Sequence, residues 1–190
     1  MPTPAPSQSL SVVLLAGGRG QRMGGRDKGL VQWQERPMIA WLHDQVRPLT
    51  DDLIISCNRN HETYAPYADR LVGDDSNDYP GPLAGIRAAL QIARHSHLLV
   101  LPCDAPNVDR ALLDDLLALA GEHPVMAKRD GHWEPLFAVI PRGLLPSLEQ
   151  AWQAGQRSTQ RWLQDHHPVA LICASDDPRL SNVNSPQLLQ

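Results

Sequence analysis

Apolar residues along this chain gather in short continuous runs, separated by polar segments that contain proline and glycine. Continuous runs without alternation are typical of strands that are buried on both faces of a sheet. Such runs stand at 12–16, 53–58 and 97–101, and segments with apolar residues at helical spacing lie between them, at 37–47 and 82–94. This order of strands and helices predicts an α/β fold in which a mainly parallel sheet is flanked by helices.

The C-terminal half predicts an antiparallel addition to this sheet. Strand-like runs at 125–128 and 136–140 flank Asp130-Gly131, and an Asp-Gly pair in this position favours a hairpin. The central sheet is therefore expected to be mixed. The other predicted elements are short strands at 30–33, 71–75 and 169–172, helices at 111–120, 142–154 and 158–166 with Asp109 and Ser158 as N-caps of the first and last, and a terminal helix or tail after Pro186.

The composition limits the class of protein. The 190 residues are expected to form one domain over 10–190, after a disordered tail at 1–9 that holds three prolines and no charged side chain. A net charge of −4 and a pI near 6.0 give no basic field for nucleic acid or an anionic membrane. No segment approaches the roughly 20 apolar residues of a membrane span. Three cysteines without a Cys-x-x-Cys pair fit a reduced, cytoplasmic protein.

A glycine-rich loop follows the first predicted strand. Five glycines fall within 17–25, and a backbone of this kind can turn its N–H groups toward one point and form a concave anion site. Arg19, Arg22 and Lys28 lie in or just beyond this loop, and no carboxylate precedes Asp27 to neutralise them. A phosphate-bearing ligand is the simplest occupant.

Two familiar glycine motifs do not fit this loop. A P-loop ends in Gly-Lys-Ser or Gly-Lys-Thr, whereas Lys28 stands between Asp27 and Gly29. The dinucleotide fingerprint needs a third glycine where this chain has Met23. A glycine-rich surface loop with solvated arginines is the alternative interpretation.

Polar side chains follow the predicted strands, at the edge where open α/β sheets bind their ligands. Asp104 lies in the segment 102–106 that directly follows the strand at 97–101, and Ser56 and Asn58 end the strand at 53–58. Asp104 suits a hard cation such as Mg²⁺. It could instead cap a helix, but Asp109 is the better cap because it immediately precedes the next helical run. Asn58 could equally be a turn former.

These features together resemble a known family. Residues 15–18 read Leu-Ala-Gly-Gly, and Arg22-Met23 and Lys28 follow. This order resembles the nucleotidyltransferases with such a loop, and most closely the molybdenum cofactor guanylyltransferases. The segment 78–85, which by itself could be a capped helix after a tight turn, is close to a second signature of that family. Asp104 within Pro-x-Asp-x-Pro, and the segment 182–186, follow in the family's order. The resemblance covers nearly the whole chain after residue 10 and implies a Rossmann-like, three-layer nucleotidyltransferase fold.

The resemblance also implies an activity. GMP would pass from GTP to the terminal phosphate of the molybdopterin form of molybdenum cofactor, with Mg²⁺ as cofactor, giving molybdopterin guanine dinucleotide and pyrophosphate. Residues from about 10 to 108 would bind GTP, and those from about 109 to 190 the acceptor. A phosphate acceptor needs no general base, because its second pKa of about 6 leaves it mostly ionised at neutral pH.

Roles follow for individual residues from the same resemblance. Arg22 and Lys28 would meet phosphates and act in catalysis together with Asp104, which would bind both GTP and the metal. The nucleotide site would also include Leu15, Ala16, Gly17, Gly18 and Asp74, and the acceptor side Asn182 and Asn184. Some family members have asparagine where this chain has Ser56. Asn58 lies two residues further on, so either of these two side chains could contact guanine.

Other functions fit parts of the same pattern. A cytidylyltransferase of the same cofactor or a sugar-phosphate nucleotidyltransferase would share the loop. Gly17-Gly18, where those relatives commonly have Ala-Gly, and the segment 78–85 together favour guanine. A GTP- or pterin-binding module without catalysis, or a structural interaction domain, would have less need of Asp104 beside Arg22 and Lys28. The protein is expected to be a monomer, with no nucleic-acid or membrane partner. Its product would pass to a delivery chaperone or molybdoenzyme.

Overall fold

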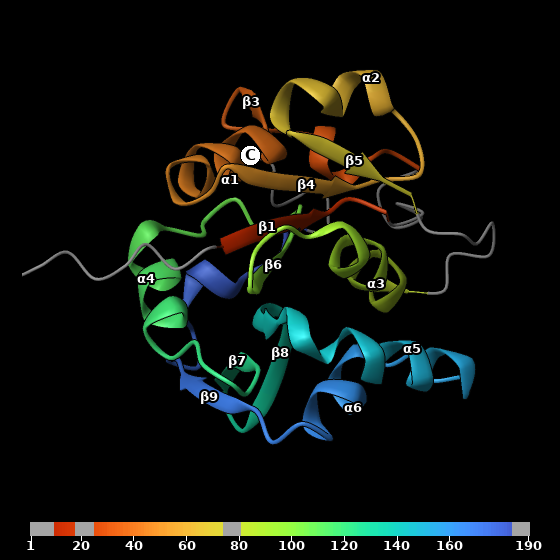
Figure 1. The fold of residues 1–190 in the computed structure, drawn as a ribbon. Coiled ribbons are helices and arrows are strands. Elements are labelled where there is room, and N and C mark those ends of the chain that lie inside the picture. The colour runs from red at the N-terminus through yellow and green to blue at the C-terminus, as the bar shows by residue number, and fades with distance from the viewer. Residues whose placement is uncertain (1–9, 18–24, 74–80, 184–190) are drawn as a thin grey trace, which may run out of the picture.

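A computed structural model describes residues 10–17, 25–73 and 81–183, and Figure 1 shows its arrangement. A seven-stranded sheet with the order β5-β4-β1-β6-β8-β7-β9 forms the centre. Within it, β8 runs antiparallel to both of its neighbours, and the other pairings are parallel. The strands are β1 (Leu10–Leu15), β4 (Asp52–Ser56), β5 (Arg70–Val72), β6 (His97–Pro102), β7 (Val125–Arg129), β8 (His132–Pro141) and β9 (Val169–Ile172).

Helices cover both faces of the sheet. They are α1 (Met38–Val46), α2 (His61–Tyr64), α3 (Pro82–Ile92), α4 (Arg110–Ala118), α5 (Leu145–Gln153) and α6 (Thr159–Gln164). Side chains from α1, α2 and α4 pack against one face, where β1 contributes Val12 and Leu14. Those from α3, α5 and α6 pack against the other face, where β1 contributes Val13. Both faces of β1 are thus buried, which confirms the predicted three-layer fold with a mixed, mainly parallel sheet.

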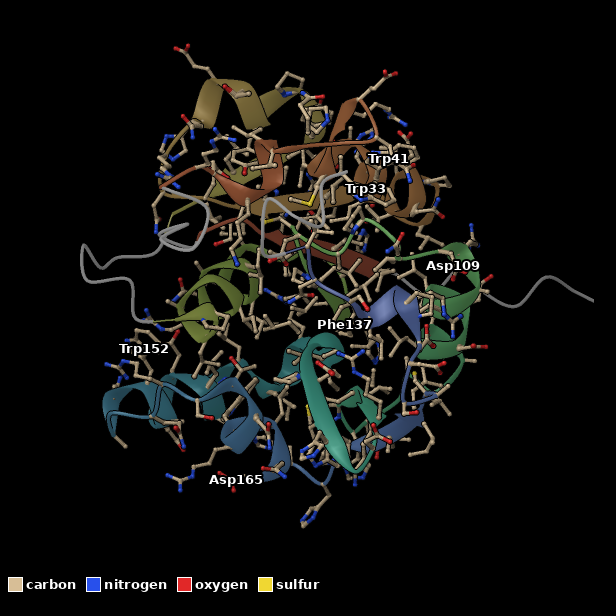
Figure 2. All side chains as sticks on the ribbon, turned by 180° about the vertical axis from the view of Figure 1, so that it is seen from behind. Trp33, Trp41, Asp109, Phe137, Trp152 and Asp165 are labelled. Atoms are coloured by element: carbon tan, nitrogen blue, oxygen red, sulfur yellow. The ribbon has the colours of Figure 1, made fainter. Side chains whose placement is uncertain are left out.

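A small hairpin precedes α1 and differs from the sequence prediction. The predicted strand at 30–33 is divided, because Lys28–Leu30 form a 3-10 turn and β2 comprises Gln32–Trp33 alone. β2 pairs with β3 (Arg36–Pro37), so a second short strand stands directly before α1. Pro37 is the N-cap of α1 and not its first residue. Trp41 of α1 donates its indole N–H to the Trp33 carbonyl at 3.0 Å, and the two rings meet edge to face with their centroids 5.4 Å apart, where Figure 2 labels them.

The β7–β8 hairpin confirms the Asp-Gly prediction but begins its second strand early. Asp130 and Gly131 have φ of 48° and 74°, as a tight hairpin turn requires. β8 starts at His132, although the sequence predicts a strand from residue 136. Met126 pairs with Ala138 and Ala127 with Glu134, so a bulge over 135–137 interrupts the pairing. Proline at 135 is tolerated there because a bulged residue need not donate to the ladder.

The predicted caps are present at the starts of two helices. The Asp109 carboxylate accepts a hydrogen bond from the Leu112 backbone N–H at 2.8 Å, and Ser158 accepts one from that of Arg161 at 3.2 Å. The predicted helix at 142–154 is divided into a 3-10 turn at Arg142–Leu144 and α5. None of the described helices has the length and apolar character needed to cross a membrane. The predicted tail at 1–9 and the segment after Pro186 lie outside the described residues.

Candidate active site at the carboxyl edge of the sheet

The carboxyl ends of three parallel strands meet at one edge of the sheet. Leu15 at the end of β1 lies opposite Ser56 of β4 and Pro102 of β6. The pairing continues past the strands, because the Ala16 N–H donates to the Ser56 carbonyl at 2.8 Å and the Cys103 N–H donates to the Leu15 carbonyl at 3.1 Å. The chain segments that carry Gly17, Asn58 and Asp104 therefore leave the sheet at the same level.

Lys28 and Asp104 form an ion pair at this edge. The Lys28 Nζ lies 3.1 Å from the Asp104 Oδ2, and Asp104 is buried while Lys28 is partly exposed. From the family resemblance, Lys28 is expected to meet phosphates, and Asp104 is expected to bind GTP and the metal. The ion pair therefore places the Lys28 ammonium and the Asp104 carboxylate next to each other at the carboxyl ends of the strands.

Asp104 fits the demands of a magnesium site. Among the described residues, no cluster of three or more His, Cys, Asp or Glu side chains could hold a metal ion by itself. Mg²⁺ commonly binds one or two carboxylates and takes its other ligands from water and substrate phosphates. A single buried carboxylate beside a lysine ammonium is compatible with this mode of Mg²⁺ binding.

Gly29 lets the Lys28 turn pack closely against the core. A Cβ at this position would lie 2.6 Å from the Tyr64 hydroxyl oxygen and 3.3 Å from the Cys103 Cβ. The turn therefore rests on α2 and on the residue that precedes Asp104. Burial raises the pKa of the Cys103 thiol well above its usual value, with the Asp104 charge as a further cause, so this cysteine stays protonated and acts as packing.

Helix α3 covers the ends of β1 and β4. It starts at Pro82 after Gly81, whose φ of 91° is easily reached by glycine. A Cβ at Gly85 would lie 2.6 Å from the Ser56 Oγ and 3.0 Å from the Leu15 Cδ2. Ser56 is consequently buried beneath this helix.

The two candidates for base recognition lie in different surroundings. Ser56 has 3% of its surface exposed, whereas Asn58 is partly exposed beyond the end of β4. The Asn58 amide oxygen lies 3.3 Å from the position that a Cβ of Gly73 would take. Gly73 directly follows β5, so Asn58 lies between two strand ends.

The C-terminal segment reaches the same edge. The Val183 N–H donates to the Asp104 carbonyl at 2.7 Å, and the Val183 side chain is buried against Val31 and Met38. Asn182, which is exposed, is therefore held beside the Asp104 loop. Of the residues expected in the site, Leu15, Ala16, Gly17, Lys28, Ser56, Asn58, Asp104 and Asn182 all lie at this edge. Gly18, Arg22, Asp74 and Asn184 lie outside the described residues.

A family model described as the MobA-like NTP transferase domain matches residues 12–169 of this chain. The chain belongs to this family. It is 61% identical over 189 residues to the molybdenum cofactor guanylyltransferase of Ectopseudomonas mendocina (strain ymp), covering all of this chain and 94% of the relative. It is 60% identical over 192 residues to the enzyme of the same name from Pseudomonas fluorescens (strain Pf0-1), covering all of this chain and 96% of the relative.

Solved structures of other proteins share the MobA-like fold. The molybdopterin-guanine dinucleotide biosynthesis protein A of Archaeoglobus fulgidus superposes with a TM-score of 0.72 at 24% identity, over 94% of each chain. The 2-C-methyl-D-erythritol 4-phosphate cytidylyltransferase of Thermus thermophilus superposes with a TM-score of 0.71 at 16% identity, over 96% of each chain. The comparisons confirm the resemblance and the fold class that the sequence predicts, and the protein is a nucleotidyltransferase.

Sequence reasoning missed several residues that build the site. Asp27, Tyr64, Gly85 and Val183 each fix a segment of it, yet none was predicted to do so. Asp27 gave one signal, as the first carboxylate after a loop of cations. Tyr64 gave none, since its partner Asp27 is distant in sequence. Gly85 and Val183 lie within the segments 78–85 and 182–186 that carry the family resemblance, but nothing in those segments indicates which residues they contact.

Proposed function

We propose that this protein transfers GMP from GTP to the terminal phosphate of the molybdopterin form of molybdenum cofactor and releases pyrophosphate. The observation that carries the proposal is the Lys28–Asp104 pair at 3.1 Å, at the carboxyl edge of the sheet where α/β folds bind nucleotides. The relatives named molybdenum cofactor guanylyltransferase, at 60% identity or more over the whole chain, support guanine and this acceptor.

The main obstacle to this reaction is charge repulsion. An anionic acceptor phosphate must approach the α-phosphorus of an anionic triphosphate, so catalysis depends on positioning and on positive charge at the phosphates. Lys28 supplies one such charge from a turn that packs on the core. Arg22 is proposed to supply another. Asp104 would hold Mg²⁺, which when bound neutralises phosphate charge and aligns the phosphate oxygens.

No side chain is needed to activate the acceptor. A phosphate monoester has a second pKa of about 6 and is mostly a dianion at neutral pH. Its oxygen attacks the α-phosphorus, and the bond to the bridging oxygen of pyrophosphate breaks. The residues at the edge orient the reactants and stabilise the charge that moves to the leaving pyrophosphate.

The remaining contacts are assigned from position. Asn58 is the better candidate for reading guanine, because Ser56 is buried beneath α3 at Gly85. We assign Leu15, Ala16, Gly17 and Gly18 to the nucleotide loop and Asp74 to the nucleoside. Asn182, beside the Asp104 loop, and Asn184 are assigned to the acceptor.

We place the protein in the cytoplasm, as a monomer that hands its product to a delivery chaperone or a molybdoenzyme. Cys57 and Cys103 are buried, Cys173 is partly exposed, and all are unpaired, as in proteins of reducing compartments.

The experiment that tests this function is pyrophosphate release by the purified protein with Mg²⁺ and molybdopterin. GTP, CTP and ATP are compared in separate reactions. Release with GTP alone is the expected result. Release with CTP instead would identify a cytidylyltransferase with the same roles for Lys28 and Asp104. The absence of release with every nucleotide would overturn the proposal in favour of a binding module.

A further inference from the structure

Asp27 is a buried carboxylate immediately before Lys28. Its side chain is 4% exposed, at the start of the 3-10 turn that carries Lys28. Burying a carboxylate is costly unless hydrogen bonds and opposite charges replace the lost water. The groups that contact Asp27 therefore show how its burial is compensated and which segments it joins.

The partners all come from the segment that follows β4. The Tyr64 hydroxyl donates to the Asp27 Oδ1, and the Asn60 Nδ2 donates to the Asp27 Oδ2 at 3.0 Å. The Arg59 Nε lies 3.7 Å from the same Oδ2. Burial raises the pKa of Tyr64, with the nearby Cys103 and Asp27 as further causes, so the phenol remains a proton donor. We call Asp27, Arg59, Asn60 and Tyr64 the clasp.

The clasp also fixes the backbone on both sides of Lys28. Arg59 donates from its Nη1 to the Gly25 carbonyl at 2.9 Å, which holds the last described part of the glycine loop. On the other side, the Leu30 N–H donates to the Asp27 carbonyl at 3.1 Å, and Gly29 packs under the Tyr64 hydroxyl. The Lys28 side chain leaves this fixed backbone and reaches Asp104.

Resting on the proposed function, we propose that Asp27 is a positioning residue for nucleotidyl transfer. Its clasp joins the Lys28 turn to the β4–α2 connection, and thereby holds the Lys28 ammonium where the β- and γ-phosphates of GTP and Asp104 meet. Asp27 itself touches no reacting atom. Its contribution passes through Lys28, so it depends on the number of phosphates that the nucleotide carries.

This dependence separates positioning from stability. A weakened clasp displaces Lys28 and lowers affinity for GTP, whose outer phosphates need the lysine. GMP lacks those phosphates and loses little. Loss of stability alone would lower the binding of both nucleotides to the same extent, or of neither.

Asp27→Asn is the variant of choice. The amide keeps an acceptor for Tyr64, but it turns an NH₂ group toward the Asn60 NH₂ and removes the charge that faces Arg59. GTP and GMP binding are measured by titration calorimetry with Mg²⁺ and without acceptor. We expect the GTP affinity and kcat/KM to fall about tenfold to a hundredfold, as when an outer partner of a metal site is removed. The GMP affinity should stay close to that of the wild type.

Asp52 offers a matched control at the amino ends of the same parallel strands. It is a fully buried carboxylate that accepts hydrogen bonds from the Ser11 hydroxyl and the Arg94 backbone N–H and contacts Arg70. Asp52→Asn is expected to lower the melting temperature and to leave the ratio of GTP to GMP affinity unchanged.

The proposal fails if folded Asp27→Asn keeps the wild-type affinity ratio, or if Asp52→Asn changes that ratio equally. Should Asp27→Asn not fold, Tyr64→Phe removes a single clasp hydroxyl. It is expected to shift the ratio in the same direction, and an unshifted ratio would overturn the proposal. Pyrophosphate release by the wild type is measured separately. Its absence would count against the proposed function, whereas the affinity ratio tests the clasp.

Discussion

At the scale of single residues, Lys28 and Asp104 play different parts although they touch. The Asp104 carbonyl binds the Val183 N–H, and its side chain accepts from Lys28. The backbone of Asp104 thus stabilises the fold, while its carboxylate pairs with the Lys28 ammonium at the candidate site. Truncating the Asp104 side chain removes the carboxylate contact with Lys28 and leaves the backbone hydrogen bond to Val183 in place.

Asp104→Ala and Lys28→Ala are therefore expected to fold normally and to lose most turnover. Removing one preorganised charge from a transition state typically lowers kcat about a hundredfold to a thousandfold. Pyrophosphate release with GTP and Mg²⁺ measures the loss, and circular dichroism checks the fold. Cys173→Ala is the control, since the Cys173 side chain is partly buried against the core and its loss should shift the melting temperature more than the rate. Unchanged release by Asp104→Ala would remove the metal assignment.

At the scale of secondary structure, the fit of α3 on the strand ends is decisive for the site. The helix approaches β1 and β4 so closely at Gly85 that a methyl group has no room against Ser56 and Leu15. A shift of α3 would move the ends of β1 and β4, from which the chain continues to Gly17 and to Asn58.

Gly85→Ala is expected to destabilise the fold by about 1–3 kcal/mol, the usual cost of overpacking a closed core. The displaced helix should also weaken GTP binding. Urea unfolding and titration calorimetry measure the two effects. Gly143→Ala is the matched control, because its added Cβ meets nothing within 4 Å and its φ is not positive. Equal stabilities of the two variants would contradict the close approach.

The elements themselves were largely predictable, because they depend on local patterns. Continuous apolar runs located β1, β4 and β6, and Asp130-Gly131 located the hairpin. The long β8 was missed at its start, since Pro135 ordinarily argues against a strand and its bulge depends on the pairing with β7.

The site residues that belong to a sequence motif were predictable. Those that are brought together only by tertiary packing were not. Lys28 and Asp104 were expected from their motifs, and the structure brings them together. The link from Asp27 to Tyr64 depends on how α2 folds back on the Lys28 turn, and Val183 meets Asp104 across most of the domain. No local pattern encodes either contact.

At the scale of the whole molecule, the sheet divides its polar groups between two edges. The carboxyl edge carries the groups assigned to nucleotide and metal. The amino edge carries Asp52, held by Ser11, Arg70 and the Arg94 backbone. The carboxyl ends of the strands thus carry the candidate site, while the network at their amino ends joins β1, β4 and β5 to the end of α3.

This second network makes the stability of the protein depend on pH. Burial opposes the ionisation of Asp52, but hydrogen bonds from Ser11, the Arg94 N–H and Arg70 outweigh it and lower the pKa of Asp52 below its usual value. A carboxyl whose pKa is lower in the folded state stabilises the fold above its unfolded pKa. That contribution is lost as the pH falls through the folded pKa, so stability should decline below about pH 4.

Asp52→Asn should therefore be less stable than the wild type at pH 7 and should show a flatter decline toward pH 3. Urea unfolding at several pH values between about 7 and 3 measures both profiles. Asp44, Asp51, Asp177 and Glu149 also have lowered pKa values. Asp44 and Asp51 are exposed and Glu149 is partly exposed, so their pairs contribute little. Asp177 is buried beside Arg179 and adds a pH dependence of its own. A residual slope in the variant is expected from these four. Parallel profiles of the two proteins would mean that Asp52 titrates alike in the folded and unfolded chains, and that the amino-edge network does not favour its charged form.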